Sequence, residues 1–533
     1  MTDTFWAEEA ADAVEANDRP PVVKGGVSPS GVPHVGNFNE VLRGHFVTEV
    51  LRDRGHDARQ VFTRDDRDPL RRVPDTVADA DGAVVALDDA APDARATLED
   101  HLGRPYVDVP DPFGCHDSWA DHFGGLLEQS TEALGVPVDY RSNDALYRDG
   151  DFLPPTRRIL SDVDAARDLL ADFQRTVDDD YVPFMPICED CGRITATATA
   201  VDLDEGTVAY RCDAADLGGV TVAGCGHEGT ADLTEGKLPW RFEWPAQWSI
   251  LDVGFEPFGK DHAEGSWPSG QRIARELIDH EPPESLVYEF FLVDGAKMSA
   301  SAGNVYTVTE ILEMVEPEVL EYFFAKNPRK QRDFALHDLD QLVDRFDRVE
   351  AIHFGDEDPA DDRERLEAET VYPHLVDEIR PRVRVPYTFA AMVGVADDRD
   401  ARLDAIRRSG HLPEDATEAQ VDDALRRVRL ARSWARRMDN EYHVAVAEER
   451  PEVSFDDATR AGLHDLADVV ADGATAEEIQ DAVFETAREH DVGVGAFFAA
   501  GYELFLGEDS GPKLGPLLAA LDRAFVVERL RSA

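Results

Sequence analysis

Apolar and polar positions in the first part of the chain alternate between strand-like runs and helical spacing. Residues 21–27 form a short apolar run typical of a buried strand, and residues 38–54 carry apolar side chains three and four positions apart, as in a helix. Gly55 is a helix-ending signal, and residues 59–64 read as a second strand. The order strand, helix, strand predicts the first βαβ unit of an α/β sheet, in which ligands lie at the carboxyl ends of the strands.

The rest of the chain divides into an α/β part and a helical part. Residues 253–262 and 288–293 read as strands and 269–279 as a helix, whereas apolar positions from Val308 onward repeat only at helical spacing. The Ala- and Asp-rich stretch 75–100 is weakly patterned and is expected to be a surface insertion. The pattern therefore predicts a sheet-based region followed by helices.

The turn between the first strand and the first helix is the first candidate for chemistry. Its sequence over 28–37, Ser-Pro-Ser-Gly-Val-Pro-His-Val-Gly-Asn, consists largely of small residues and leads directly into the helix. Backbone N–H groups left unpaired at a helix start attract anions, as does the helix dipole, and His34 and Asn37 would add side-chain donors. The turn predicts a phosphate site, although similar glycine-containing units also occur without a ligand.

Charge and length narrow the class of protein. The 533 residues suffice for about three or four domains, and the formal net charge of -56 is spread along the whole chain. The only lysines are Lys24, Lys237, Lys260, Lys297, Lys326, Lys330 and Lys513. An acidic, lysine-poor chain indicates adaptation to a salt-rich cytoplasm. In molar salt the Debye length is about 3 Å, so repulsion between the acidic surface and RNA is screened and an RNA partner is not excluded.

Membrane-spanning and signal segments are not apparent, and a cytoplasmic protein is expected.

Four of the five cysteines fall in one window. Cys188 and Cys191 form a Cys-x-x-Cys turn, Cys212 follows, and Cys225 or His227 could supply the fourth position of a tetrahedral zinc site. A redox pair is the less favoured interpretation, because it would not need further Cys and His nearby. We therefore expect a structural zinc module.

The fifth cysteine, Cys115, adjoins His116. One such pair of neighbours makes neither a metal site nor a catalytic dyad, and we interpret both residues as structural.

Aromatic and lysine side chains gather in the later α/β stretches. Trp240, Trp244 and Trp248 lie within nine residues, where they could be core or could form the wall of a ligand pocket. Lys260 and Lys297 each follow a predicted strand. Small residues around Lys297 favour a loop whose ammonium could reach a polyphosphate.

Two motifs resemble the signatures of class I aminoacyl-tRNA synthetases. Residues 33–37, Pro-His-Val-Gly-Asn, resemble the HIGH signature, and residues 297–301, Lys-Met-Ser-Ala-Ser, resemble the KMSKS loop. Most of the chain is similar to the archaeal-type class I lysyl-tRNA synthetase family. The further stretches that carry this likeness are 29–31, 65–68, 71–74, 240–248, 256–262, 382–387 and 511–515.

The resemblance implies a domain order. A Rossmann-type α/β catalytic domain would comprise residues 1–180 and 237–330, and the zinc-binding insertion residues 181–236. An all-helical anticodon-binding region would occupy residues 331–533, with a polar break at 329–333 as the boundary.

The resemblance also implies a reaction and the residues that perform it. The carboxylate of L-lysine would attack the α-phosphorus of ATP, and the adenylate would acylate the 2′-hydroxyl of the terminal adenosine of tRNA(Lys). His34, Asn37 and Lys297 would be catalytic. The residues expected to hold ATP, arriving with Mg²⁺, are Pro29, Ser30, Gly31, His34, Gly36, Asn37, Lys297, Met298, Ser299 and Ser301.

The two signatures depart from the family pattern at two positions. Asn37 replaces the second His of HIGH and keeps a hydrogen-bond donor. Ala300 replaces the second Lys of KMSKS. Lys297 must therefore carry the positive charge of the loop alone, or Lys260 assists it.

A pocket for lysine needs a carboxylate or aromatic side chains around an ammonium. By resemblance, Trp240, His262 and Tyr288 would surround the amino acid. The carboxylates that could pair with the ε-ammonium are Glu40, Asp65, Asp66 and Asp68.

Two other functions remain open from the sequence. A glutamyl-type synthetase shares the class signatures, but its pocket should present Arg or Lys to the substrate side chain. A zinc-stabilised RNA-binding paralogue without catalysis is opposed by His34, Asn37 and Lys297. The basic run 426–437 is a candidate RNA-binding face in either case, although such runs are commonly solvated helix surfaces.

Overall fold

The computed structural model describes residues 4–175, 177–194, 196–216, 220–298, 305–376, 378–396, 398–447 and 449–533. The chain divides into two compact units. Unit 1 comprises Met1–Glu310 and Phe323–Phe334, and unit 2 comprises Ile311–Tyr322 and Ala335–Ala533. Within the described ranges, no helix has the length and apolarity needed to cross a membrane.

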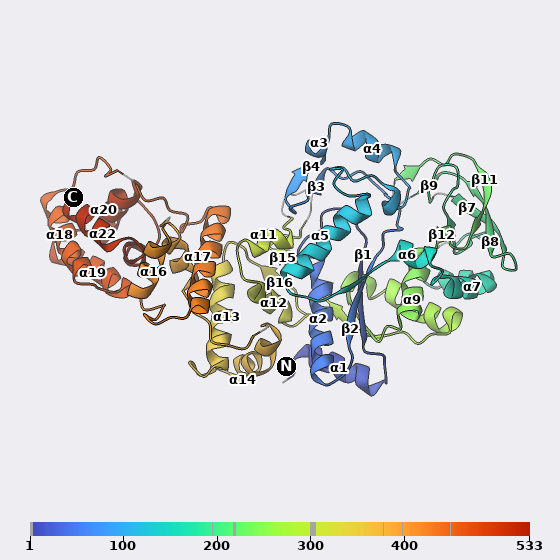
Figure 1. Ribbon diagram of the computed structural model, residues 1–533, viewed down its shortest axis with the longest axis horizontal. Helices are drawn as coiled ribbons and strands as arrows, with labels where there is room; N and C mark the ends of the chain where they lie inside the picture. Colours follow the sequence, from blue (N-terminus) through green and yellow to red (C-terminus); the bar gives the residue numbers. More distant parts are fainter. Residues whose placement is uncertain are drawn as a thin grey trace. The chain divides into compact units, whose positions relative to one another are not determined.

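A five-stranded parallel sheet forms the centre of unit 1, with the strand order β14-β13-β1-β2-β5. The strands are β1 (Val22–Val27), β2 (Arg59–Arg64), β5 (Asp139–Ser142), β13 (Phe255–Gly259) and β14 (Glu284–Tyr288). This arrangement confirms the predicted Rossmann-type α/β fold (Figure 1). Because every strand runs in the same direction, all five carboxyl ends meet at one edge of the sheet.

The helix α2 (Phe38–Asp53) follows β1 and packs on β1 and β13, and α1 (Trp6–Ala16) packs on α2. Gly25 in β1 shows how close the contacts at this face are. A Cβ at Gly25 would lie 2.4 Å from the ring of Phe62 and 2.9 Å from Oε1 of Glu40. Only glycine therefore lets the carboxylate of α2 reach the middle of the sheet.

The apolar run 288–293, predicted as one strand, is divided between two sheets. β14 ends at Tyr288, whereas β15 (Phe291–Val293) pairs with β16 (Arg332–Phe334). Between them, the N–H of Glu289 donates to the carbonyl of Pro328 at 2.8 Å, which holds the chain outside the central sheet. The single-strand prediction was wrong because a sequence pattern does not show which partner each residue pairs with.

Residues 75–100, expected to be a surface insertion on the basis of their weak pattern, contain regular elements and contribute to a packed core. The elements are β3 (Thr76–Ala78), β4 (Val84–Ala86), α3 (Leu87–Ala90) and α4 (Ala94–Asp100). Val77 and Leu87 are fully buried and belong to one apolar cluster with Trp119 and Phe123 of α5 (Trp119–Ala133). The partners lie far away in sequence, so the local pattern underestimates the core.

Between β5 and β13 the chain leaves the central sheet. After α6 (Asn143–Arg148), α7 (Leu153–Ser161) and α8 (Val163–Ala171), it forms an antiparallel sheet of β7 (Ala196–Asp202), β8 (Thr207–Cys212) and β11 (Glu228–Asp232). Two short pairs accompany it, β6 (Met185–Pro186) with β12 (Gly236–Lys237) and β9 (Ala215–Asp216) with β10 (Thr221–Val222). The chain returns through α9 (Trp240–Leu251), and α10 (Ser266–Ile273) follows β13.

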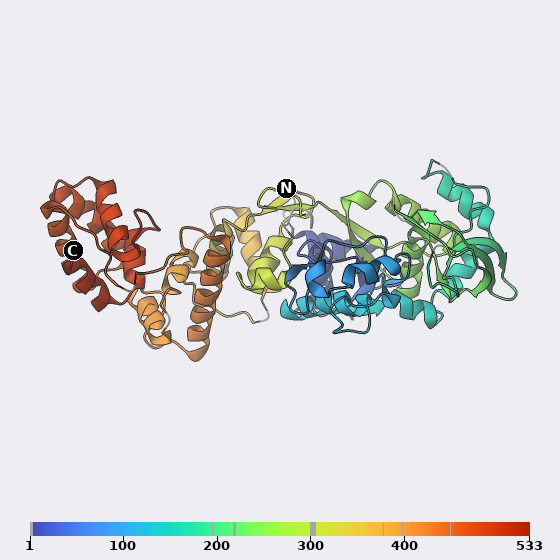
Figure 2. The same ribbon diagram turned by 90° about the horizontal axis from the view of Figure 1, so that it is seen from above.

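Helices continue into unit 2 (Figure 2). α11 (Val308–Leu312) and α12 (Pro317–Ala325) lie before β16. The later helices are α13 (Leu339–His353), α14 (Asp362–Leu366), α15 (Tyr387–Val393), α16 (Arg399–Arg408), α17 (Glu418–Met438), α18 (Asp457–Ala471), α19 (Ala476–Glu489), α20 (Val494–Leu506), α21 (Leu514–Ala520) and α22 (Arg523–Arg531). Thr417 and Thr475 begin α17 and α19 with capping boxes, and Trp434 of α17 is buried against Tyr387.

Candidate active site

The backbone N–H groups of residues 34–39, at the start of α2, are hydrogen-bonded. The N–H groups of residues 34, 35 and 36 donate to Oδ1 of Asn37, the carbonyl of Tyr306 and Nδ1 of His34 at 2.9, 2.8 and 3.0 Å. The N–H groups of residues 37, 38 and 39 donate to the carbonyls three positions earlier. The expectation of unpaired N–H groups at this helix start was therefore wrong for residues 34–39, and the side chains of His34 and Asn37 are the candidate donors there.

His34 and Asn37 are each held in one orientation by these hydrogen bonds. Because Nδ1 of His34 accepts from Gly36, the proton of the neutral ring resides on Nε2. Burial lowers the pKa of His34, which favours the neutral form. Oδ1 of Asn37 accepts from the N–H of His34. The amide nitrogen Nδ2 of Asn37 is therefore the end of this side chain that can donate to a ligand. The turn thus offers one imidazole N–H and one amide NH₂.

A cavity of about 480 Å³ opens beside this turn. Six of the residues expected to hold ATP line it, namely Pro29, Ser30, Gly31, His34, Asn37 and Met298. Arg64, Arg72 and Phe123 also line it. The structure thus brings Met298 to the cavity beside the HIGH-like turn, while Ser299, Ala300 and Ser301 lie outside the described residues.

A second, smaller cavity lies at the carboxyl ends of β1, β2 and β13. Trp240, His262, Glu40 and Asp65 all line it, so four of the candidate amino-acid-binding residues meet here. Trp240 stacks on Trp244 with ring centroids 5.0 Å apart, and His262 lies 5.1 Å from Trp240. Tyr288 is joined to this group through its hydroxyl, which donates to Oε2 of Glu40 at 3.2 Å.

Acidic side chains outnumber the ammonium groups in the lining of this cavity. The carboxyl groups are those of Glu40, Asp65 and Glu256, and the ammonium is that of Lys24. Glu256 is neutralised by Lys24 at 2.8 Å and also accepts from the indole N–H groups of Trp244 and Trp248. Burial, together with Glu256, raises the pKa of Glu40 to about 8. Burial, together with Asp68, raises the pKa of Asp65 to about 6. The cavity therefore favours a cation.

Asp66 and Asp68 serve the framework around this cavity. Asp66 accepts from the N–H of Asp144 at 2.9 Å, and Asp68 is bound by the buried ammonium of Lys237 and by Arg71. Of the four carboxylates weighed from sequence, Glu40 and Asp65 remain the candidates for a substrate ammonium.

Arg67 and Lys237 are important residues that sequence reasoning missed. Arg67 donates to Asp144 at 2.8 Å and to the carbonyls of Thr234 and Gly236 at 2.7 and 2.9 Å. Lys237 also donates to Glu243 of α9 at 2.8 Å. The rarity of lysine was a signal for Lys237, but its partner Asp68 lies 169 residues away in the sequence.

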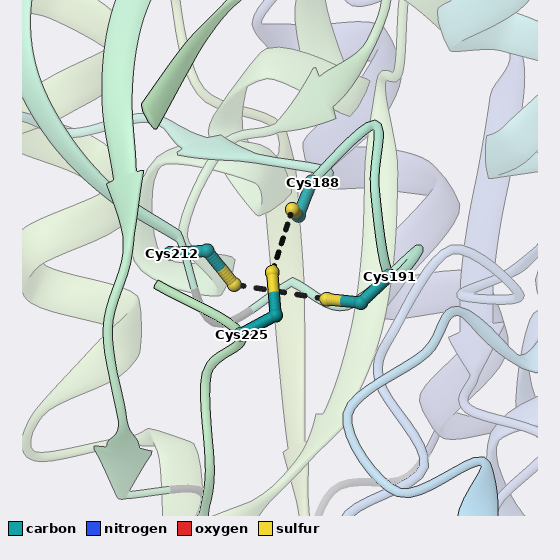
Figure 3. A group of neighbouring side chains, drawn as sticks. All are labelled: Cys188, Cys191, Cys212 and Cys225. Carbon is teal, nitrogen blue, oxygen red and sulfur yellow. Dashed lines mark hydrogen bonds between the residues drawn. The ribbon is translucent and has the colours of Figure 1, made fainter. Parts of the chain in front are cut away.

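The four cysteines of the insertion converge (Figure 3). Sγ of Cys188 lies 3.7 Å from that of Cys225, and Sγ of Cys191 lies 3.7 Å from that of Cys212. Four thiolates at Zn–S distances of about 2.3 Å would be about 3.8 Å apart, so this set fits zinc. His227 lies outside the group, since its Nε2 contacts Glu189 at 2.8 Å. Cys225, and not His227, is therefore the fourth candidate ligand.

A second group of potential metal ligands surrounds Cys115. Sγ of Cys115 lies 3.2 Å from Oδ2 of Asp111, 3.2 Å from Nδ1 of His116 and 3.3 Å from Nδ1 of His122. Nε2 of His122 contacts the carbonyl of Ala78 at 2.9 Å, an arrangement that orients a metal-binding imidazole. The interpretation of Cys115 and His116 as merely structural missed Asp111 and His122, whose spacing was the available signal.

The basic run on α17 is partly internal. Arg427 is buried and donates to Glu316 and Asp347, each at 2.9 Å. Arg432 donates to the carbonyl of Val444 at 3.0 Å. Arg429 and Arg436 are exposed and lie seven positions apart, on one side of the helix. Only part of the run is therefore available as an RNA-binding face.

The parallel sheet, the His-Asn turn at its central strand and the lysine-bearing loop define a class I aminoacyl-tRNA synthetase. The sequence model described as "tRNA synthetases class I (K)" matches residues 4–374, and the chain belongs to this family. The lysine–tRNA ligase of Natronomonas pharaonis is 56% identical over 99% of this chain and 97% of its own length. The lysine–tRNA ligases of Haloarcula marismortui and Pyrococcus horikoshii are 55% and 32% identical, each over 99% of this chain and over 97% and 99% of their own lengths.

Proposed function

We propose that this protein is a lysine–tRNA ligase, which activates L-lysine with ATP and transfers it to the 2′-hydroxyl of the terminal adenosine of tRNA(Lys) in a salt-rich cytoplasm. The observation that carries the choice of lysine is the small cavity, where Glu40, Asp65 and Glu256 face a single ammonium, Lys24. A substrate with a positive side chain would pair with the carboxylate that Glu40 forms on losing its proton, whereas a glutamate side chain would bring a further acid into the cavity. Identity of 56% to a lysine–tRNA ligase along the chain supports the same choice.

The first step needs alignment and charge neutralisation rather than a protein nucleophile, because the lysine carboxylate is already ionised. His34 would donate from Nε2 and Asn37 from Nδ2 to phosphate oxygens, and Lys297 would approach from the loop after β15. Trp240 and His262 would enclose the lysine side chain. Magnesium, which supplies further charge neutralisation, enters with ATP and needs no dedicated protein cage.

Zinc is proposed for both ligand groups. The thiolates of Cys188, Cys191, Cys212 and Cys225 would fill all four positions of one ion. Asp111, Cys115, His116 and His122 would do the same for a second ion. A site with four protein ligands has no open position for a reacting group, so each ion would hold its segment folded. Unit 2 would contact the anticodon of tRNA(Lys), with Arg429 and Arg436 among its exposed basic residues.

The test is amino-acid-dependent exchange of pyrophosphate into ATP, followed by acylation of tRNA. The purified chain, assayed in molar KCl, is expected to exchange with L-lysine and not with L-glutamate, and then to charge tRNA(Lys). Exchange with glutamate alone would support the glutamyl-type alternative. RNA binding without exchange of either amino acid would support the non-catalytic alternative.

A further inference from the structure

Two of the seven lysines converge on one aromatic ring at the edge of the central sheet. The ammonium of Lys260 lies 5.7 Å, and that of Lys297 5.5 Å, from the centroid of Phe290. Lys260 opens the 3-10 turn Lys260–His262 directly after β13, Phe290 follows β14, and Lys297 lies beyond β15. Three separate strand ends therefore bring two positive charges to one ring.

This lysine pair is joined to the phosphate-binding turn. Asn39, in the first turn of α2, donates from Nδ2 to the carbonyl of Glu289 at 3.3 Å, and Glu289 precedes Phe290. The methyl group of Met298, next to Lys297, lies 2.8 Å from the position that a Cβ on Gly36 would occupy. Both lysines thus belong to the edge at which His34 and Asn37 present their donors.

The partner of Lys260 is one that a phosphate could replace. Lys260 forms an ion pair with Glu289, and the two side chains are 45% and 31% exposed. An exposed ion pair contributes little stability, so exchanging one carboxylate for a polyphosphate costs little. In a chain with only seven lysines and a net charge of -56, two of them lie at this one ring.

We propose that Lys260 is a second catalytic cation, which leaves Glu289 to bind the β- and γ-phosphates of ATP and shares with Lys297 the neutralisation of the leaving pyrophosphate. This role rests on the proposed function and deepens it. A carboxylate oxygen of lysine forms a bond to the α-phosphorus, and the bond from that phosphorus to the bridging oxygen breaks. The electron pair stays on pyrophosphate, and both lysines remain protonated throughout. Lys260 thereby supplies the charge that Ala300 does not provide.

Lys260→Ala and Lys260→Arg, measured by pyrophosphate exchange with L-lysine and pyrophosphate each varied in turn, test this role. Lys260→Ala is expected to lower kcat roughly 100-fold, the scale for losing one donor to a developing anion. The KM for pyrophosphate should rise and the KM for lysine should stay unchanged, and Lys260→Arg should recover most of the rate. Lys330→Ala, which removes an exposed lysine of unit 1, is the matched control and should behave as the wild type.

Glu289→Gln distinguishes a catalytic role of Lys260 from a structural role of its ion pair with Glu289. This variant breaks the ion pair but leaves Lys260 positively charged, so exchange should equal or exceed that of the wild type. The proposal is overturned if Glu289→Gln is as damaging as Lys260→Ala, or if Lys260→Ala keeps the wild-type kcat and KM for pyrophosphate. A wild-type chain that exchanges pyrophosphate with no amino acid would instead contradict the proposed function.

Discussion

Oε2 of Glu40 accepts a hydrogen bond from the hydroxyl of Tyr288 at 3.2 Å, while Oε1 accepts from the N–H of Gly26 at 2.7 Å. Burial, with repulsion from Glu256, raises the pKa of this carboxyl to about 8. Glu40 is therefore largely protonated at neutral pH before a cation is placed beside it. A substrate ammonium must displace that proton.

Lysine affinity should consequently rise with pH. Below about pH 8 each bound lysine releases up to one proton from Glu40, so the Kd should fall by up to about tenfold per unit between about pH 6 and 8. Calorimetry in two buffers of different ionisation enthalpy measures both the Kd and the proton release. Glu40→Gln should bind lysine at least about tenfold more weakly and lose the pH dependence. Glu49→Gln, on the same helix, is the control, and a pH-independent Kd in the wild type would contradict this assignment.

The metal content of the insertion should depend on Cys225 and not on His227. Cys225→Ser removes one of four converging thiolates and should lower the zinc content by one ion per chain, as measured by elemental analysis. His227→Ala should leave the zinc content unchanged, because His227 is bound to Glu189. Loss of zinc in His227→Ala with retention in Cys225→Ser would reverse the assignment.

The group around Cys115 should hold a second zinc ion. The wild-type chain is expected to contain two ions, and His116→Ala should contain one. His116 is an exposed ligand, so its replacement preserves the buried contacts of His122 with Asp111 and Ala78. His101→Ala, which removes an imidazole outside the group, is the control. Two zinc ions in His116→Ala would show that this group is no metal site.

Lys237→Met should destabilise unit 1 strongly. The ammonium is almost fully buried between Asp68 and Glu243, and removing one partner from such a group typically costs about 3–5 kcal/mol. Urea unfolding at constant salt measures the loss, with Lys330→Met as the control. Burial raises the pKa of Glu243 to about 7, so the defect should shrink as the pH falls through this range. An unchanged unfolding midpoint would show that the pair is not a stabilising contact.

The features that could be predicted from the sequence are those that depend on residues close together in the chain. The strand at 22–27, the helix from Phe38 and the strand at 59–64 were predicted with nearly the observed bounds, because apolar spacing and Gly55 mark them. The α/β fold class was predicted correctly for the same reason. The cluster of Cys188, Cys191, Cys212 and Cys225 was anticipated because ligand types at short spacing are informative without a structure.

Features that depend on distant partners were not predictable in the same way. The hydrogen bond from the N–H of Val35 to the carbonyl of Tyr306 spans more than 270 residues, and it removes a donor that the local pattern leaves free. Lys237 pairs with Asp68, and the N–H of Asp144 donates to Asp66, which leaves Glu40 and Asp65 as the candidates for a substrate. The sequence alone does not show these contacts.

Residues 65–68 follow one another in the chain yet face three different neighbours. Asp65 lines the small cavity, and Asp66 accepts a hydrogen bond from the N–H of Asp144 in α6. Arg67 donates to the carbonyl of Gly236, and Asp68 pairs with Lys237, at the end of the insertion. A shift of the insertion by even one ångström would pull on the pocket carboxylate within the same loop. In the proposed function, the position of the insertion would therefore influence the substrate pocket through this one loop of four residues.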